Sequence, residues 1–420
     1  MTGPRKLGWG LAALLVAGNM IGSGVYLLPA SLAPVGSSSI VGWMVATAGA
    51  LMLAAVFAGL GRMRPAADGL ADYAGQGLGR FFGFQAALAY WAACWMGNVA
   101  VAVAATGYLA VFLPVLREPW PAALCNVVLI WLVTAAYMAG PRLVARLGGG
   151  LLIIGLLPIG VAVAAGVMAF DPEVFAASWS PSGVSLFDSV PASLAVIFWA
   201  FLGVESAAVL SAKVRNPETD VGRATFAGVL LAGVVYMATS VAVFGVIPAG
   251  ELAASTSPFA DLAGRVMGAA AAGFVAVCAV AKTIGTLGGW TMLSGETARS
   301  AAREGFLPAV FGRGVETPRA NPLIHGVLMS AAALLSVQPT LGAQFGVLVN
   351  VTTVLILVVY ALCCLALIRF SAELKWRAAA VGGLAFAVWA AAFSDPGLLW
   401  PTLGFFVVVS AAWFFVRRPA

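Results

Sequence analysis

Two charged side chains lie inside long apolar stretches of this sequence. Glu205 falls within an apolar segment at about 189–212, and Lys282 falls within another at about 266–300. An ionisable group at membrane depth costs a few kcal/mol or more unless it is paired or hydrated, so each is a candidate functional residue. Glu205 fits a gate or a proton site, with a structural anchor as the alternative. Lys282 fits a coupling or vestibule role, with a side chain that snorkels to the membrane surface as the alternative.

Tryptophans beside glycines form the second group of candidates. Trp199 lies just before Leu202-Gly203, and Trp290 directly follows the segment 287–289, Leu-Gly-Gly. Tryptophans near the ends of a span normally belong to the interfacial belt, but these two lie near mid-span. An indole face at that depth can stack on a cationic or apolar side chain, with a cation–π energy of about 0.5–2 kcal/mol. Core packing is the alternative for either residue.

Motifs of other function classes are missing from the sequence. His325 is the only histidine, so a zinc site or a Ser-His hydrolase has almost nothing to use. The glycines at 77–79 do not continue into a dinucleotide fingerprint, and the lack of a phosphate-binding loop argues against an ATP-driven pump. We therefore predict no enzyme, no cofactor and no metal. The five cysteines lack paired spacing and look like packing residues: Cys94, Cys125, Cys278, Cys363 and Cys364.

The composition is typical of an integral membrane protein. Of 420 residues, 62% are hydrophobic and 9% are charged, whereas soluble domains carry about 25% charged residues. A membrane span needs about 20 apolar residues, and we predict one membrane domain, 1–420, with twelve helices and no large extramembrane part. The predicted helices lie at about 9–33, 39–61, 82–113, 122–139, 143–170, 189–212, 221–247, 266–300, 323–338, 342–369, 376–393 and 398–416.

Glycine-rich breaks interrupt the first and sixth of these segments, at 18–29 and 197–206. Lipid cannot bond a freed backbone group, so such a break must face protein, water or a ligand. Broken helices at matching positions of two halves indicate the inverted repeat of secondary transporters, although the halves show no convincing sequence identity. A close-packing surface is the alternative. The repeats would be about 9–170 and 189–369, followed by two helices at about 376–416.

The basic residues predict the orientation. Lysine and arginine cluster in every second loop, and the loops between hold mainly acidic residues; the exceptions are Arg117, Arg265 and Lys282. Because positive charge marks cytoplasmic loops, both termini are predicted to be cytoplasmic, in agreement with the even helix count. The net charge of +6 therefore reflects membrane topology and does not indicate nucleic acid binding.

Six motifs carry a family resemblance over nearly the whole chain, at 18–29, 90–98, 199–206, 257–259, 287–291 and 295–298. With them the chain resembles the amino acid–polyamine–organocation (APC) transporter superfamily. Within it, the chain is most similar to the bacterial arginine/agmatine antiporter group and related basic amino acid/polyamine antiporters. The motifs at 90–98 and 287–291 are the more specific to this subgroup. The resemblance also implies a homodimer.

The resemblance implies roles for individual residues. The backbone of Ser23 and Gly24 would bind a substrate carboxylate, as free N–H groups at the start of a half-helix should. The substrate ammonium would meet the carbonyls of Met20, Trp199 and Leu202. Trp199 would stack on the substrate stem, and Trp290 would form a middle gate. The distal pocket would be lined by Ala93, Cys94, Asn98 and Thr352, and a cytoplasmic-side gate would comprise Tyr90, Glu205 and Tyr360.

Two positions depart from the family pattern. Thr352 replaces a serine, which is a mild change. Lys282 replaces a glycine, and a second positive charge near the path would disfavour a dicationic substrate. Sodium-independent relatives carry a lysine on the fifth helix in place of sodium, whereas the fifth span here has none. Whether Lys282 does that work from the eighth helix stays open at this point.

These observations predict a secondary active transporter of a bacterial inner membrane. It would exchange a cationic amino acid for its decarboxylation product amine, or for another amino acid, by alternating access. The alternative, favoured by Lys282 and a single buried acid, is a neutral amino acid exchanger or a proton-coupled symporter. A channel is disfavoured because it would need a polar-lined pore, and a sensor is disfavoured because it would need an output domain; the sequence shows neither. No sodium site is evident, and the expected partners are a small amino acid or amine and the lipid bilayer, with no nucleic acid.

Overall fold

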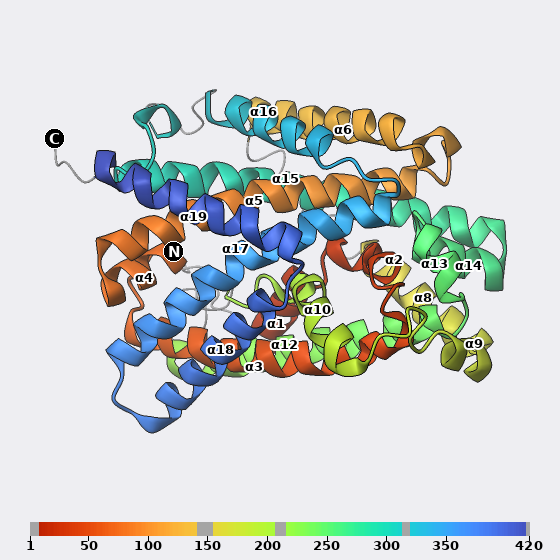
Figure 1. Cartoon of the computed structure of the whole chain (residues 1–420), viewed down its shortest axis with the longest axis horizontal. Helices are drawn as coiled ribbons and strands as arrows, with labels where there is room; N and C mark the ends of the chain where they lie inside the picture. The colour runs from red at the N-terminus through yellow and green to blue at the C-terminus, as the bar shows by residue number, and fades with distance from the viewer. Residues whose placement is uncertain (1–7, 141–153, 206–215, 313–319, 417–420) are drawn as a thin grey trace, which may run out of the picture.

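In the computed structural model, the described residues are 8–140, 154–205, 216–312 and 320–416, and their regular elements are all helical (Figure 1). Seven of these helices are long and apolar enough to span a membrane. The prediction of an all-α membrane protein is therefore confirmed at this level. The seven long helices are α3 (Ser39–Met63), α5 (Arg80–Leu109), α6 (Pro119–Ala139), α12 (Pro217–Phe244), α15 (Ala269–Arg303), α17 (Leu341–Phe370) and α19 (Pro396–Val416).

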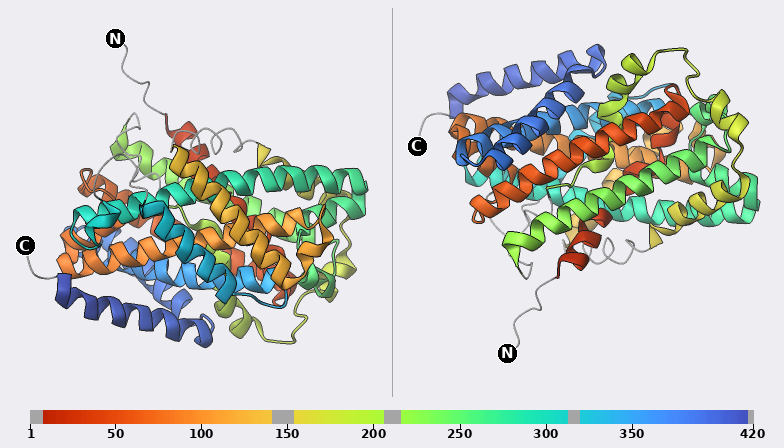
Figure 2. Two further views of the ribbon diagram at one scale, coloured as in Figure 1. Left: turned by 90° about the horizontal axis from the view of Figure 1, so that it is seen from above. Right: turned by 90° about the horizontal axis from the view of Figure 1, so that it is seen from below.

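Helix α5 forms the centre of the bundle. It packs against α15 and α17, and 78% of its most apolar stretch is buried inside the protein. The corresponding figure for α19 is 11%, so most of α19 lies on the outside of the bundle. The views in Figure 2 show the long helices running along the molecule beside one another. A side chain on the inner faces of α5, α15 or α17 is thus held far from lipid.

Shorter helices occupy most of the remaining predicted segments. Residues 143–153 of the predicted helix at 143–170, and residues 206–212 of the one at 189–212, lie outside the described residues. The shorter helices are α1 (Trp9–Met20), α2 (Leu28–Ser31), α8 (Leu157–Ala169), α10 (Leu186–Phe198), α16 (Ala320–Leu335) and α18 (Leu374–Ala392).

Several short connecting helices are absent from the predicted set. Their charged residues lower the mean hydropathy, and each buries at most a narrow apolar face. On α14, for example, Phe259 and Leu262 are buried, whereas Asp261 is exposed. These connecting helices are α4 (Leu70–Leu78), α9 (Pro172–Ala177), α13 (Ala249–Ala254) and α14 (Pro258–Met267).

The first predicted break is present. Helix α1 ends at Met20, Gly22 is extended (φ −92°, ψ −167°), and a 3-10 turn, η1 (Ser23–Tyr26), leads to α2. Tyr26 ties this break to its surroundings: its hydroxyl donates to the carbonyl of Gly155, and its own carbonyl accepts the hydroxyl of Tyr108 at 3.0 Å. The interruption therefore faces protein, as the hydrocarbon environment requires.

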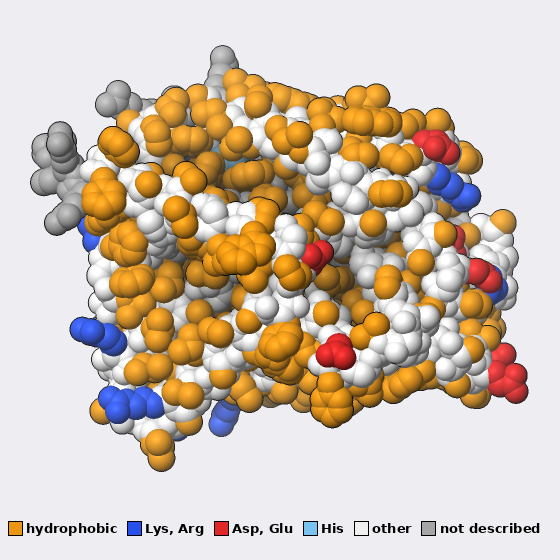
Figure 3. All heavy atoms as spheres, viewed as in Figure 1, with side chains coloured by type: hydrophobic (Ala, Val, Ile, Leu, Met, Phe, Trp, Pro, Cys, Tyr) orange, Lys and Arg blue, Asp and Glu red, His pale blue; other side chains and the backbone are white. Residues whose placement is uncertain are grey.

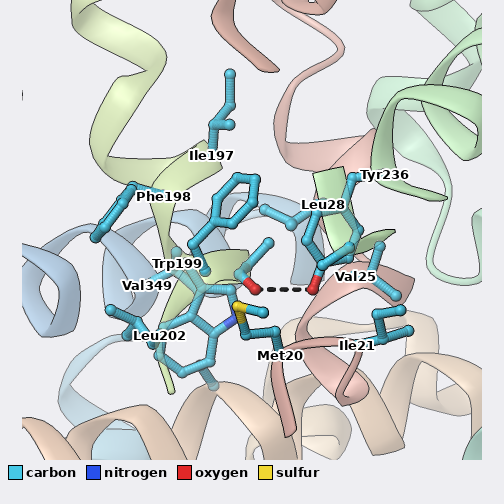
Figure 4. Close-up of a cluster of buried hydrophobic side chains, with 14 of the residues drawn as sticks. Met20, Ile21, Val25, Leu28, Ile197, Phe198, Trp199, Leu202, Tyr236 and Val349 are labelled. Carbon is cyan, nitrogen blue, oxygen red and sulfur yellow. Dashed lines mark hydrogen bonds between the residues drawn. The ribbon is translucent and has the colours of Figure 1, made fainter. Parts of the chain in front are cut away.

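The second break follows α10. A 3-10 turn, η4 (Trp199–Phe201), is followed by an extended Leu202 and by Gly203 at φ +103°. A positive φ of this size suits glycine and is strained for other residues. Tyr236 of α12 donates its hydroxyl to the carbonyl of Ala200 at 2.8 Å, the dashed line in Figure 4. The break is thus fixed from a neighbouring helix.

Charged side chains separate along the molecule. In the face shown in Figure 3, lysines and arginines gather mainly at the left end, acids lie mainly towards the right, and a broad hydrophobic surface lies between. This distribution agrees with the alternation of basic and acidic loops in the sequence. All five cysteines are free, and four of them are buried.

Candidate functional site

The two tryptophans singled out in the sequence meet in the interior. The ring centroids of Trp199 and Trp290 are 5.3 Å apart, with 37° between the ring planes. Both rings contact Gly97 of α5: a Cβ atom there would lie 2.6 Å from Trp290 Cζ3 and 2.9 Å from Trp199 Cη2. Since atoms that close must move apart, the absence of a side chain at residue 97 makes room for the pair.

The two helix breaks meet at the same place. Met20 and Leu202 are buried beside Trp199 (Figure 4), and η1 packs against η4. The carbonyl of Met20 accepts the Gly22 N–H at 2.6 Å, and the carbonyl of Trp199 accepts the Leu202 N–H at 3.2 Å. These carbonyls keep further acceptor capacity, since each oxygen has two lone pairs.

The backbone of Ser23 and Gly24 begins the 3-10 turn η1. The first N–H groups of a helical turn have no partner within that turn. The start of η1 thus lies near the carbonyl acceptors of both breaks, since η1 packs against η4. A zwitterion carries the complementary pair of charges, an acceptor carboxylate and a donor ammonium.

Asn98 is the most telling polar side chain of the site. It is fully buried, and its Nδ2 donates to Thr291 Oγ1 at 2.7 Å. Its Oδ1 is buried without a hydrogen-bond partner among the described residues. Buried polar atoms nearly always have a partner, and leaving one unpaired costs about 1–3 kcal/mol. This oxygen is therefore suited to accept a hydrogen bond from a donor-bearing ligand.

The other predicted pocket residues are buried on two helices that pack together. Ala93 and Cys94 lie on α5, and Thr352 lies on α17. The hydroxyl of Thr352 donates to the carbonyl of Leu348 in its own helix at 2.7 Å. It is therefore left with acceptor capacity towards a ligand.

The three predicted gate residues form one hydrogen-bonded cluster. Tyr360 donates its hydroxyl to Glu205 Oε2 at 2.5 Å, and Tyr90 donates to Oε1 at 3.3 Å. The Gly203 N–H also donates to the carboxylate, at 3.1 Å. Glu205 thereby links the second helix break to α5 and α17. The hydrogen bonds of Glu205 must therefore break before the second helix break can separate from α5 and α17.

Lys282 lies apart from the tryptophan pair and from the cluster around Glu205. Only 7% of it is exposed, and its stem packs directly on Gly155, where a Cβ atom would lie 2.4 Å from Lys282 Cδ. The carbonyl of Gly155 accepts the hydroxyl of Tyr26. Lys282 thus lies where α15, the middle of the fifth predicted span and the first helix break come together. Trp290, two turns along the same helix, faces α5 instead.

Sequence reasoning missed several contributors. Gly97 and Thr291 lie inside the matched motifs, but the sequence does not indicate that Gly97 contacts the two indole rings or that Thr291 accepts a bond from Asn98. Tyr236 and Gly155 stood in apolar segments with no distinguishing pattern. Which helix each of them faces follows from tertiary packing, which periodicity alone does not reveal.

A separate cavity of about 420 Å³ lies by α13 and α14, and none of the predicted site residues lines it. Its charged lining residues are Arg117, Glu251, Asp261 and Arg265. Across the described ranges, no three His, Cys, Asp or Glu side chains are grouped so that they could hold a metal ion.

Comparison with known proteins gives a consistent result. The family model "Amino acid permease" matches residues 7–418. The cadaverine/lysine antiporter of Escherichia coli K12 is 36% identical over 378 residues, 88% of this chain and 85% of that protein. The putrescine transporter PotE is 32% identical in Escherichia coli K12 (87% of this chain, 83% of that protein) and 30% identical in Haemophilus influenzae (85% and 83%).

Gly97→Ala should destabilise the protein by about 1–3 kcal/mol, because the new methyl group overpacks both indole rings. Gly289→Ala is the matched control: it lies beside Trp290 but has no atom within 4 Å of its would-be Cβ. Thermal unfolding in detergent, followed by tryptophan fluorescence, measures both. A melting temperature for Gly97→Ala equal to or above that of the control would contradict the shared contact.

Proposed function

The chain belongs to the amino acid permease family of the APC superfamily, and we propose that it exchanges a cationic amino acid for its decarboxylation product amine. It is an amino acid or amine antiporter and not an enzyme, as its relatives indicate. Its membrane would be a bacterial inner membrane, with both termini on the cytoplasmic side. The fold would be twelve helices in a 5+5 inverted repeat, 9–170 and 189–369, plus two helices at 376–416, acting as a homodimer.

The observation that carries this proposal is the pair of indole rings between the two helix breaks. Trp199 and Trp290 offer π-faces to an aliphatic or cationic stem. The buried, unpartnered Oδ1 of Asn98 supports a distal group that donates hydrogen bonds, as a lysine or diamine ammonium does. A purely apolar side chain would leave that oxygen unsatisfied.

The proposed substrate contacts begin at the breaks. The carboxylate would bind the backbone of Ser23 and Gly24, as the free donors of a helical start favour anions. The distal group would enter a pocket between α5 and α17. The ammonium would bind the carbonyls of Met20, Trp199 and Leu202, and the pocket would be lined by Ala93, Cys94, Asn98 and Thr352.

The proposed gate is the cluster of Tyr90, Glu205 and Tyr360. Its bonds join three elements, so closing it would seal the binding site from one side of the membrane and opening it would release the substrate there. Exchange then follows if the empty carrier reorients slowly and the loaded carrier reorients fast.

Counterflow in proteoliposomes tests this function. Vesicles are preloaded with lysine, arginine, ornithine, cadaverine, putrescine or agmatine, or with a neutral amino acid, and uptake of each labelled compound is followed. We expect exchange between a cationic amino acid and its amine, and none into empty vesicles. Exchange of neutral amino acids alone would refute the proposed substrate class.

A neutral amino acid exchanger or proton symporter is the second candidate. The observation that favours it is Lys282, a buried cation on α15, which would repel dicationic amines. The same vesicles distinguish it, because a symporter accumulates substrate in unloaded vesicles when a proton gradient is applied.

Replacing either stacked tryptophan by leucine should abolish exchange. Stacking on a cationic stem needs a π-face, whereas simple core filling would accept leucine. Trp199→Phe should therefore retain part of the rate, and Trp400→Leu, at a position 72% exposed on α19, should retain all of it. Normal counterflow by well-folded leucine variants at both 199 and 290 would show that the stacking role is wrong.

Glu205→Gln should alter the pH profile of exchange far more than substrate affinity. Glutamine preserves the shape, and its one carbonyl oxygen can still accept a tyrosine hydroxyl, but its NH2 group cannot accept the second hydroxyl and the side chain cannot gain or lose a proton. We expect the profile between pH 5 and pH 8 to flatten and the apparent affinity to change by less than about threefold. A large loss of affinity with an unchanged pH profile would instead make Glu205 a substrate ligand.

Lys282→Met tests the vestibule role, since methionine keeps apolar packing on Gly155 and removes only the charge. If the ammonium repels incoming cations, uptake of cationic substrates should rise by about threefold to tenfold relative to neutral ones. Loss of all transport in a folded variant would instead favour a coupling or bracing role between α15 and the first helix break. An unchanged rate and profile would leave Lys282 without either role.

A further inference from the structure

His325, the single histidine of the chain, lies on α16 with 1% of its surface exposed. Its Nε2 is 2.7 Å from the indole nitrogen of Trp91, and its Nδ1 is 2.8 Å from the carbonyl oxygen of Asn321. The rings of Trp91 and Phe311 meet it edge-on. Both nitrogens of a buried imidazole are therefore engaged, one towards another helix and one towards its own.

These partners determine the protonation state of the ring. An indole N–H only donates, so Nε2 must accept; a carbonyl only accepts, so Nδ1 must carry the proton. The ring in this arrangement is the neutral Nδ1–H tautomer. A second proton on Nε2 would point at the indole N–H, and two donors facing each other cannot form a hydrogen bond.

The His325–Trp91 hydrogen bond is connected to the proposed gate by the peptide bond between Trp91 and Tyr90. Trp91 follows Tyr90, whose hydroxyl donates to Glu205, so both side chains are set by the same turn of α5. On the other side, α16 is fastened by Asn321, whose Nδ2 donates to the carbonyls of Gly295 and Phe311 at 3.0 and 3.2 Å. The His325–Trp91 bond thus holds this turn of α5 against a braced helix.

We propose that His325 is a positioning residue for the gate: its neutral ring holds Trp91, and through it Tyr90, in place, and its protonation releases that turn of α5. This inference rests on the proposed gate at Glu205. Because release loosens Tyr90 from Glu205, exchange should speed up as the pH falls through the titration of His325.

The surroundings of the ring provide little compensation for a positive charge. Among the described residues, the hydrogen-bond and aromatic-ring partners of the ring are Trp91, Phe311 and Asn321. The titratable and charged groups beside these partners are Tyr90, next to Trp91 on α5; Glu296, next to Gly295 on α15, with its ion-pair partner Arg299 at 3.8 Å; and Tyr137 of α6, whose hydroxyl lies against Gly295. Protonation would therefore favour a ring orientation in which Nε2–H no longer points at the indole N–H of Trp91.

The transport test compares the wild type with His325→Gln, whose side-chain oxygen can accept the indole bond but does not titrate. The two rates should agree near pH 8, and the wild type should be about fivefold faster near pH 5.5, the factor expected for one net hydrogen bond of about 1 kcal/mol. Any pH dependence from Glu205 is common to both proteins and cancels in the ratio. Trp91→Phe, which removes the donor, should be fast at both pH values.

Ser330→Ala is the matched control. It removes the bond that Trp131 donates to Ser330 Oγ at 3.0 Å, another indole bond to α16 but without a titratable partner. Its pH profile should follow that of the wild type. Identical profiles for the wild type and His325→Gln would overturn the proposal.

A second readout is independent of transport. Because the chain has one histidine, ¹⁵N-histidine labelling gives the NMR signals of this ring alone. We expect the Nδ1–H tautomer at pH 8, a changed Nε2 signal in Trp91→Phe, and conversion to the imidazolium on acidification. If the ring stays neutral down to pH 5.5, the proposed release of Trp91 by protonation of His325 is wrong. If wild-type vesicles exchange nothing, the proposed function fails, and these signals still decide the titration of His325.

Discussion

Backbone polar groups at the two helix breaks are the constraint on which the rest of the structure depends. Hydrocarbon cannot satisfy them, so each must find a partner inside the protein. Tyr236 supplies a hydroxyl to Ala200, Tyr108 supplies one to Tyr26, and the carboxylate of Glu205 accepts the N–H of Gly203. Hydrogen bonds to these partners thus hold both breaks in position within the bundle. In the proposed function, the remaining backbone groups of the two breaks would bind the substrate's carboxylate and ammonium.

Close approach of helices is the second condition, and small residues provide it. A Cβ at Gly42 of α3 would lie 2.5 Å from Ile197 Cδ1, just before the second break. Gly155 does the same for the stem of Lys282. Without these contacts the breaks would be separated from the helices that complete their hydrogen bonds, so the hydrogen bonding of the breaks depends on this close packing.

The sequence predicted the seven long apolar helices and both breaks because apolar runs and glycine clusters are local patterns. The grouping of Tyr90, Glu205 and Tyr360 came from the family resemblance, and their contacts in the structure agree with it. The connecting helices α4 and α14 were missed because their apolar faces are short and interleaved with charge. The pairing of Lys282 with Gly155, and of His325 with Trp91, depends on which faces of distant helices meet, and a single sequence holds no signal for that.

The shared contact of the indole pair has a mechanical consequence. Trp199 and Trp290 rest on the same atom-sized gap above Gly97, so neither ring can swing towards α5 without entering volume held by the other. A movement of either ring therefore changes the packing of the other. In the proposed function, a substrate that contacts one indole would act on both, so binding of the substrate and sealing of its path would depend on one shared contact.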